Sequence, residues 1–417
     1  MNRYPSQQPF TGNSTIRILV LLLVLCFGLG ATVASVSSQE LDESPENLQT
    51  TSNKKFRKDQ SHPIRLGTSG GNVEDVTPLQ CCDGTLGALV EKNGVQYILS
   101  NNHVLARSNK AKKGEAIIQP GLGDQRPICE PLDPGADTVA HLSARKKVKF
   151  GANKTNKIDA AIAEVVPGAV RPNGEIIGIG MPGSNPIKPY LGMKVKKSGR
   201  TTGLTRGFIS VVNGMAQVEY PKKCGSETVN VARFRDLFYV TGNNGKPFIK
   251  GGDSGSMVYE DRNNCPSPVG LIFAGNEEYA AASPAATVQK IVSKLDPKGP
   301  MHFVGCNSTS FGTTSASSGE SSTGGSDTLF GSSAVSRPLI DERQVELATD
   351  AMRNRREDLF QIRGVQGFGI GITLYGPIEP AIYVFSTETP DEIRKHLPET
   401  IDGYRVEVFK TDSFVAY

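Results

Sequence analysis

The chain has 417 residues, and because 46 of them are Lys or Arg and 42 are Asp or Glu its formal net charge is only +4. That balance provides no electrostatic basis for binding DNA, RNA or an acidic substrate. The 45 Gly, the 26 Pro, the lack of Trp and an apolar share of 37% favour a loop-rich, mainly β fold, and they exclude a coiled coil, a collagen-like fibre, a fully disordered chain and a multi-span membrane protein.

Residues 1–36 are predicted to be a signal peptide or an N-terminal membrane anchor. The run 18–36 carries no charge, and its densest part has the length of the apolar region of a signal peptide, with small residues following at 31–35. The whole run is also just long enough to span a bilayer, so an uncleaved anchor stays open, and a buried core helix is a third interpretation. Either of the first two predicts an extracytoplasmic protein, secreted or periplasmic.

Six cysteines lie beyond Cys26, and an even number in an oxidising compartment is compatible with three disulfides. Their pairing cannot be derived from the sequence. Because no Cys-x-x-Cys pair exists and the five histidines are scattered, we expect no structural zinc site, no other metal and no cofactor. These cysteines are Cys81, Cys82, Cys129, Cys224, Cys265 and Cys306.

Two polar segments divide the rest of the chain. Residues 37–62 are predicted to be a flexible spacer, and residues 307–337, rich in Ser, Gly and Thr, a flexible linker. The folded regions are then 63–306 and 338–417. The first contains short apolar runs broken by Gly, Pro and Asn, which predict two small β-barrels or a large sandwich, closed by a helix at 288–295. The runs are 87–90, 97–100, 116–119, 160–166, 207–212 and 269–274.

The segment Gly251-Gly252-Asp253-Ser254-Gly255-Ser256 has the composition of a nucleophile turn. Glycine permits a tight turn, in which the backbone N–H groups of Gly252 and Ser254 can point to one spot beside the Ser254 hydroxyl. Hydrolysis of an amide by serine also needs a base and a group that orients the base.

His103 is the best candidate for the base, because it directly follows an apolar strand and is therefore held rigidly. Asp159 is the best candidate for the orienting acid. It lies among small apolar residues, where a lone charge is costly and an imidazole is a suitable partner.

Five blocks in this order resemble chymotrypsin-like serine peptidases, and among them the bacterial branch that includes α-lytic protease. The resemblance covers about residues 80–296. The blocks are Gly84-Thr85-Leu86-Gly87 with Ser100-Asn101-Asn102-His103, then Ile158-Asp159-Ala160-Ala161, then Lys197-Ser198-Gly199-Arg200-Thr201-Thr202-Gly203, then Gly252-Asp253-Ser254-Gly255, and last Gly270-Leu271-Ile272-Phe273-Ala274-Gly275-Asn276.

The resemblance implies a chymotrypsin-like double β-barrel at 63–306 and a role for each matched residue. His103 would be the general base, Asp159 would set its tautomer, and Ser254 would be acylated, with the N–H groups of Gly252 and Ser254 as the oxyanion hole. The strand Phe273, Ala274 and Gly275 would pair with the backbone of a peptide substrate. By position, Lys197 would pair with Asp253.

One departure from the family concerns Phe273. It stands where the family usually has a serine that donates a hydrogen bond to the catalytic aspartate, so Asp159 is expected to lose one donor. This loss would weaken catalysis.

Residues 338–417 are predicted to be a small α+β domain. Helical spacing at 341–361 is followed by strand-like runs at 365–374, 381–386 and 404–410 and a short helix at 391–396. The region resembles the accessory module of some bacterial proteases. We expect it to dock on the protease domain as a regulatory or folding-assistance domain, or else to be an independent binding module on a tether.

The predicted function is that of an exported serine endopeptidase acting on a protein or peptide substrate, without a nucleic-acid partner. Two alternatives stay open. The first is a catalytically decayed protease scaffold that binds peptides or proteins, and the second is a surface adhesin in which both folded regions bind partners.

Overall fold

The computed structural model describes residues 54–78, 80–130, 133, 135–307 and 340–416, and its secondary structure is mainly β. All of these residues belong to one compact unit. The signal or anchor segment 1–36 lies outside the described residues, as do most of the spacer 37–62 and nearly all of the linker 307–337. None of the helices in the described part is long and apolar enough to cross a membrane.

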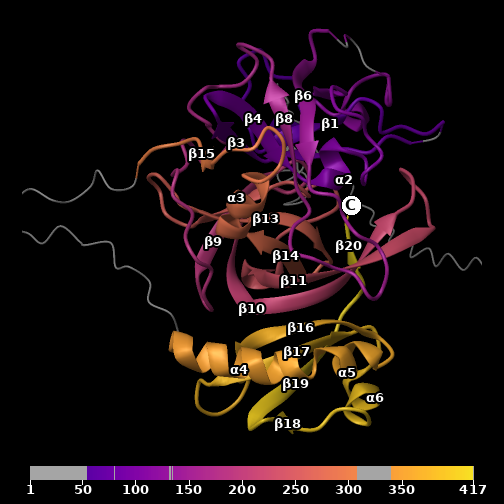
Figure 1. Ribbon diagram of the computed structural model, residues 1–417, viewed down its shortest axis with the longest axis vertical. Coiled ribbons are helices and arrows are strands. Elements are labelled where there is room, and N and C mark those ends of the chain that lie inside the picture. The colour runs from indigo at the N-terminus through magenta and orange to yellow at the C-terminus, as the bar shows by residue number, and fades with distance from the viewer. Residues whose placement is uncertain (1–53, 79, 131–132, 134, 308–339, 417) are drawn as a thin grey trace, which may run out of the picture. The chain divides into compact units, whose positions relative to one another are not determined.

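The first sheet closes into a barrel (Figure 1). Around the ring, β1 pairs with β2, β3 with β4, β4 with β8, β8 with β6, β6 with β5, and β5 with β1. Only Gly87 separates β2 from β3, and its N–H donates to the carbonyl of Leu99 in β4. The strands are β1 (Thr68–Asn72), β2 (Gly84–Leu86), β3 (Ala88–Lys92), β4 (Val95–Ser100), β5 (Ala116–Ile118), β6 (Thr138–Arg145) and β8 (Ala161–Val165).

The second sheet contains another closed ring, in which β9 pairs with β10, β10 with β11, β11 with β14, β14 with β13, β13 with β12, and β12 with β9. The hairpin of β10 and β11 is long, with 19 and 14 residues. β10 is therefore much longer than the strand-like run 207–212 that the sequence predicted. The strands are β9 (Lys194–Gly199), β10 (Gly203–Pro221), β11 (Val229–Gly242), β12 (Met257–Glu260), β13 (Pro268–Gly275) and β14 (Tyr279–Pro284).

Two closed barrels, one after the other in the chain, confirm the predicted mainly β, chymotrypsin-like double barrel. Each barrel has one further short strand. β15 (Met301–Phe303) pairs with β3 of the first barrel, and β7 (Thr155–Asn156) pairs in parallel with β11 of the second. The helices of this region are η1 (Lys54–Phe56), α2 (Asn102–Leu105), η2 (Leu122–Asp124), η3 (Asn243–Gly245) and α3 (Ala285–Val292).

The C-terminal region continues the sheet of the second barrel. β16 pairs antiparallel with β10, β17 with β16, and β19 in parallel with β17. Buried residues of α4, among them Met352, share one hydrophobic cluster with Phe238 of the barrel. The elements are α4 (Glu342–Asn354), α5 (Arg356–Gln361), β16 (Val365–Ile372), β17 (Pro380–Ser386), α6 (Pro390–Arg394), β18 (Thr400–Ile401), β19 (Tyr404–Lys410) and β20 (Phe414–Val415).

The predicted single helix over 341–361 is two helices. Asp341 caps α4 by accepting a hydrogen bond from the N–H of Arg343 at 2.8 Å. The chain then leaves helical geometry at Arg355, whose φ is −105° and ψ is 7°. As a result α5 turns away from α4, and its buried Leu359 and Phe360 pack in the same cluster.

All six cysteines beyond Cys26 are paired, which confirms three disulfides. The bonds are Cys81–Cys129, Cys82–Cys224 and Cys265–Cys306. Cys82–Cys224 joins residues 142 positions apart and ties the start of β2 to the tip of the β10–β11 hairpin. Such bonds are consistent with an extracytoplasmic protein.

Candidate active site

His103 lies in a short helix that begins where a strand of the first barrel ends. β4 stops at Ser100, and α2 spans Asn102–Leu105. The side chain of Asn101 donates to the carbonyl of Asp159 at 2.8 Å, and that of Asn102 donates to the carbonyl of Lys146 at 2.7 Å. These two bonds anchor the turn that carries the imidazole, so the histidine is held by backbone contacts and not by its own packing alone.

The structure brings His103 and Asp159 together. Nδ1 of His103 lies 2.7 Å from Oδ2 of Asp159, and the exposed fractions of the two residues are 8% and 1%. Oδ1 of Asp159 accepts the backbone N–H of Asn102 at 2.6 Å. A buried carboxylate needs such partners, because its transfer from water is otherwise costly. With Nδ1 bound to the carboxylate, the orientation of the imidazole ring is set.

Tyr220, which the sequence analysis missed, supplies the donor that Asp159 was expected to lose. Its hydroxyl donates to Oδ2 of Asp159 at 2.8 Å, and the residue is fully buried in β10. Burial, together with the charge of Asp159, raises the pKa of Tyr220 well above its ordinary value, so the hydroxyl keeps its proton. The expected deficit at Asp159 is therefore wrong. No local motif singles out Tyr220, since its partner is 61 residues away.

Phe273, which stands where the resemblance placed a serine, packs its ring in a buried cluster that also contains Tyr220. The side chain is fully buried, and its ring centroid lies 4.5 Å from that of Phe234. Phe234 in turn stacks on Tyr220 at 6.2 Å. The two aromatic contacts hold the phenol of Tyr220 at the carboxylate.

Ser254 lies on a turn of the second barrel that is pressed against the first barrel. Its carbonyl accepts the N–H of Thr85 at 2.8 Å, and its hydroxyl lies 3.4 Å from the carbonyl oxygen of Phe273. A Cβ on Gly255 would lie 2.1 Å from Oγ of Ser100, the last residue of the strand that precedes His103. Ser254 is thus on the barrel junction, near the end of the strand that leads to His103.

The turn has free backbone donors on one side. Gly252 has a φ of +93°, and a Cβ there would lie 2.6 Å from Oγ1 of Thr201, so only glycine fits without strain. Within the described part of the chain, neither the N–H of Gly252 nor that of Ser254 donates to another protein group. Two unused N–H groups flanking Asp253 are the kind of donors that stabilise an oxyanion.

The pair between Lys197 and Asp253, which the resemblance implied, is present. Nζ of Lys197 lies 3.4 Å from Oδ2 of Asp253, and both side chains are fully buried. Asp253 also accepts the N–H of Thr201 at 2.8 Å and that of Lys250 at 3.0 Å. Burial lowers the pKa of Lys197, and the charge of Asp253 opposes this shift. These contacts anchor Asp253, the residue that directly precedes Ser254 in the turn.

The strand expected to receive substrate already has a partner from the same chain. Gly275 pairs antiparallel with Val415 of β20, which also runs parallel to β10 (Figure 1). The side chain of Asn276 donates to Oγ1 of Thr411 at 2.7 Å and to the carbonyl of Asp412 at 3.0 Å. Phe273 and Ala274 are fully buried. The C-terminal segment therefore occupies backbone positions at the end of β13.

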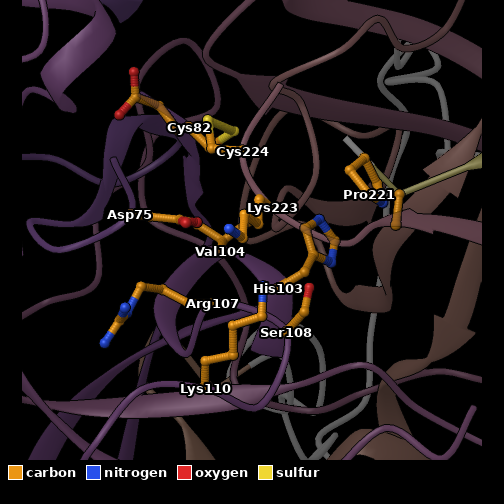
Figure 2. A pocket seen from close by; sticks show the side chains of 12 residues that line it. Asp75, Cys82, His103, Val104, Arg107, Ser108, Lys110, Pro221, Lys223 and Cys224 are labelled. Carbon is orange, nitrogen blue, oxygen red and sulfur yellow. A yellow bond between two sulfur atoms is a disulfide. The ribbon is translucent and has the colours of Figure 1, made fainter. Parts of the chain in front are cut away.

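A narrow cavity of about 50 Å³ lies beside His103 (Figure 2). Ala416 forms part of its wall, together with Asp75, Lys110, and Lys223 of the β10–β11 hairpin. The N–H of Ala416 donates to the carbonyl of Glu219 at 2.9 Å. Burial raises the pKa of Asp75 to about 6, against the opposing effect of Arg107. Segment 411–416 thus reaches the cavity that the imidazole lines.

Comparison with families and curated proteins locates one similarity. The family described as the Nal1 C-terminal domain matches residues 152–283. This match is less than half of the chain, contains both Asp159 and Ser254, and ends before the C-terminal region 338–417. No relative among curated proteins matches the chain.

Several solved protease structures are similar to part of the chain. A glutamic acid specific serine protease described as using a histidine triad in substrate binding is 17% identical, with a TM-score of 0.37, and the alignment covers 58% of this chain and 100% of that one. Thermobifida fusca Protease A is 13% identical, with a TM-score of 0.37 and coverage of 58% and 99%. An α-lytic protease homologue, N4, is 16% identical, with a TM-score of 0.37 and coverage of 56% and 97%.

The activities in these names belong to those proteins. The fold of this chain rests on its own strand pairings, which close two consecutive barrels. The chain is a protein of the chymotrypsin-like fold, similar to the bacterial α-lytic-protease-like proteases.

Proposed function

We propose that the chain is an exported serine endopeptidase that hydrolyses peptide bonds through Ser254, His103 and Asp159. The observation that carries this proposal is the buried contact of 2.7 Å between Nδ1 of His103 and Oδ2 of Asp159. Keeping a carboxylate and an imidazole together out of water is costly, so such a pair is a candidate for a functional site. A histidine oriented by a carboxylate is also the base that acyl transfer by a serine needs.

In the first half of the reaction His103 takes the proton of the Ser254 hydroxyl while Oγ attacks the carbonyl carbon of the substrate. The oxygen of the tetrahedral intermediate becomes negative and is stabilised by the N–H groups of Gly252 and Ser254. His103 then passes its proton to the leaving amine, and an acyl-enzyme remains on Ser254. In the second half water replaces the amine and releases the acid by the same proton transfers. Asp159 and Tyr220 hold the imidazole in one tautomer throughout.

Export is proposed on two grounds. Three disulfides need an oxidising compartment to form and persist. The uncharged run 18–36 has the composition of an export signal or an anchor. Expression with and without residues 1–36, followed by fractionation of the cells, tests whether this run directs export.

The C-terminal region is proposed to keep the enzyme latent. β20 holds Gly275, one of the residues expected to pair with substrate, and Ala416 lines the cavity beside His103. A peptide substrate that adds a strand to β13 would compete with this segment. A catalytically decayed scaffold stays the second candidate, because a partner's peptide could pair with β13 in the same way without being cleaved.

Labelling of the purified protein with a fluorophosphonate probe tests both proposals. Labelling that is lost in Ser254→Ala supports an activated serine. Absence of labelling in the intact chain, with strong labelling after removal of residues 411–417, supports a latent enzyme. Absence of labelling in both forms, with retained fold by circular dichroism and measurable peptide binding, contradicts the peptidase and favours the binding scaffold.

A further inference from the structure

A second, larger cavity lies where the β10–β11 hairpin meets helices α4 and α5. Its volume is about 740 Å³, within the range of about 300–1,000 Å³ that is typical of small-molecule sites. Residues of the loop before β7 and of both helices line it, and neither His103 nor Ser254 does. It is therefore separate from the candidate active site.

The lining of this cavity is strongly cationic. Five basic side chains face it, whereas only Asp236 and Glu357 are acidic. Asn153, Thr155 and Asn213 add neutral polar groups. The basic residues are Lys157, Arg233, Arg235, Arg353 and Arg356.

One carboxylate serves three of these cations. Asp236 lies 2.7 Å from Nζ of Lys157, 3.4 Å from Nη2 of Arg353 and 3.6 Å from Nη1 of Arg235. The three cationic side chains are between 41% and 48% exposed, so each keeps donors that are directed to solvent in the cavity. Arg353 also lies 3.7 Å from Asp350, yet the five cations of the lining still outnumber Asp236, Glu357 and Asp350, so positive charge is left over.

Arg233 carries the strongest indication of a ligand. The residue is only 7% exposed, and its Nε is buried without a hydrogen-bond partner in the described part of the chain. Its guanidinium lies 4.4 Å above the ring of Phe360, and Nη1 lies 3.5 Å from Glu357, whose side chain is 67% exposed. Buried polar groups are nearly always satisfied, so a cavity-lining residue whose Nε–H has no acceptor points to a missing one.

We propose that this cavity binds a small molecule carrying a phosphate group. A phosphate offers several acceptor oxygens and up to two negative charges, which match the surplus of cations and the forked donors of arginine. Residues of the barrel and of helices α4 and α5 contribute to the same lining, so the ligand would bridge them. Such a ligand stabilises the C-terminal region against the barrel through mass action.

Isothermal titration calorimetry of the full chain with inorganic phosphate, pyrophosphate and a hexose phosphate tests this site. We expect saturable binding of at least one of them. Arg235→Gln and Arg353→Gln should each weaken it by about tenfold, because each removes one charge-assisted contact. Arg355→Gln is the matched control, since this residue lies between α4 and α5, is 55% exposed and does not line the cavity. The Arg355→Gln variant should bind the phosphates with the affinity of the natural chain.

Arg233→Lys tests the buried donor, because it keeps the charge and removes the fork. We expect a loss larger than that of either exposed variant, and if this variant does not fold, Arg235→Gln and Arg353→Gln still decide. Ser254→Ala should bind normally, since the site does not depend on catalysis. The proposal would be overturned by lack of binding of all three phosphates, or by an affinity of the Arg235→Gln and Arg353→Gln variants equal to that of the natural chain. An equal response to chloride at matched ionic strength would also overturn it. Tighter binding of pyrophosphate or of the hexose phosphate supports it in either case and tells whether the rest of the cavity takes a second phosphate or an organic group.

Discussion

The hydroxyl of Tyr220 donates a hydrogen bond of 2.8 Å to Oδ2 of Asp159, the same oxygen that lies 2.7 Å from Nδ1 of His103. This contact joins the long β10–β11 hairpin to the carboxylate on the first barrel. It gives Asp159 the donor that the resemblance had placed at position 273, where this chain has Phe273. With Tyr220 as donor, Oδ1 and Oδ2 of Asp159 both have hydrogen-bond partners.

Tyr220→Phe is expected to lower the rate of fluorophosphonate labelling by about 10- to 150-fold, because a hydrogen bond to a charged group contributes roughly 1.5–3 kcal/mol. Tyr239→Phe is the matched control: its hydroxyl is also buried, but it donates to the carbonyl of Met215 at 2.8 Å, away from the triad. Both variants should lose similar stability toward urea. Equal labelling rates in the two variants would contradict a positioning role for Tyr220.

Breaking the buried pair of Lys197 and Asp253 should destabilise the fold strongly. Lys197→Met leaves Asp253 as an uncompensated buried charge, and we expect the free energy of unfolding to fall by about 3–5 kcal/mol. Arg206→Gln provides the comparison, because its pair with Asp261 involves a side chain that is 50% exposed. That variant should lose less than about 1 kcal/mol. Urea denaturation of both measures the difference, and similar losses would refute the importance of the buried pair.

Release of the C-terminal segment should increase access to Ser254. Ala416→Pro removes the N–H that donates to the carbonyl of Glu219, while the extended conformation of the preceding Val415 stays compatible with proline. β20 is held by backbone hydrogen bonds and by the buried ring of Phe414, so the loss of one backbone hydrogen bond of about 1 kcal/mol should raise labelling about 5-fold. Ser413→Ala keeps the backbone unchanged and should label at the original rate. Unchanged labelling in the proline variant would mean that the segment does not restrict the site.

The stability of the fold should depend on the ionisation of Asp75. Burial raises the pKa of this carboxyl from 3.8 to about 6, while Arg107, Lys110 and His103 oppose the shift and Asp83 adds to it. Between these two values the folded state binds more protons than the unfolded state. Stability is therefore present at low pH and is lost as pH rises from about 4 to about 6.

Asp75→Asn removes this dependence. When the pH rises from about 4 to about 7, the free energy of unfolding of the variant should therefore increase by about 1–3 kcal/mol relative to that of the natural chain. Urea denaturation at pH 4 and at pH 7 measures this difference. Glu227→Gln, on an exposed turn, serves as the control and should show no such change. A constant difference between the Asp75 variant and the natural chain at both pH values would contradict the shifted ionisation.

Most residues of the candidate site could be predicted from the sequence, because each lies in a segment with a distinctive local sequence. His103 follows an apolar strand, Asp159 lies among small apolar residues, and Ser254 lies in a glycine turn whose φ of +93° at Gly252 only glycine adopts easily. The structure confirms the double barrel and the three disulfides. The catalytic roles of these residues stay predictions until the serine is labelled.

The features that sequence reasoning missed all depend on contacts between distant segments. Tyr220 meets Asp159 across 61 residues, and Asn276 meets Thr411 across 135. The hairpin that carries Tyr220 is far longer than its apolar run, because pairing with β16 and β20 extends the sheet beyond the barrel.

The sequence by itself determined the mainly β class, the order of His103, Asp159 and Ser254, and the even set of cysteines, because strand patterning, turn glycines and composition are local properties of the chain. Only the tertiary structure decided which cysteines pair, which hydroxyl completes the surroundings of Asp159, which segment pairs with Gly275 and which arginines share one cavity. These choices depend on the barrel closure and on the addition of β16 to β10, since only the folded sheet brings such residues within a few ångströms of one another.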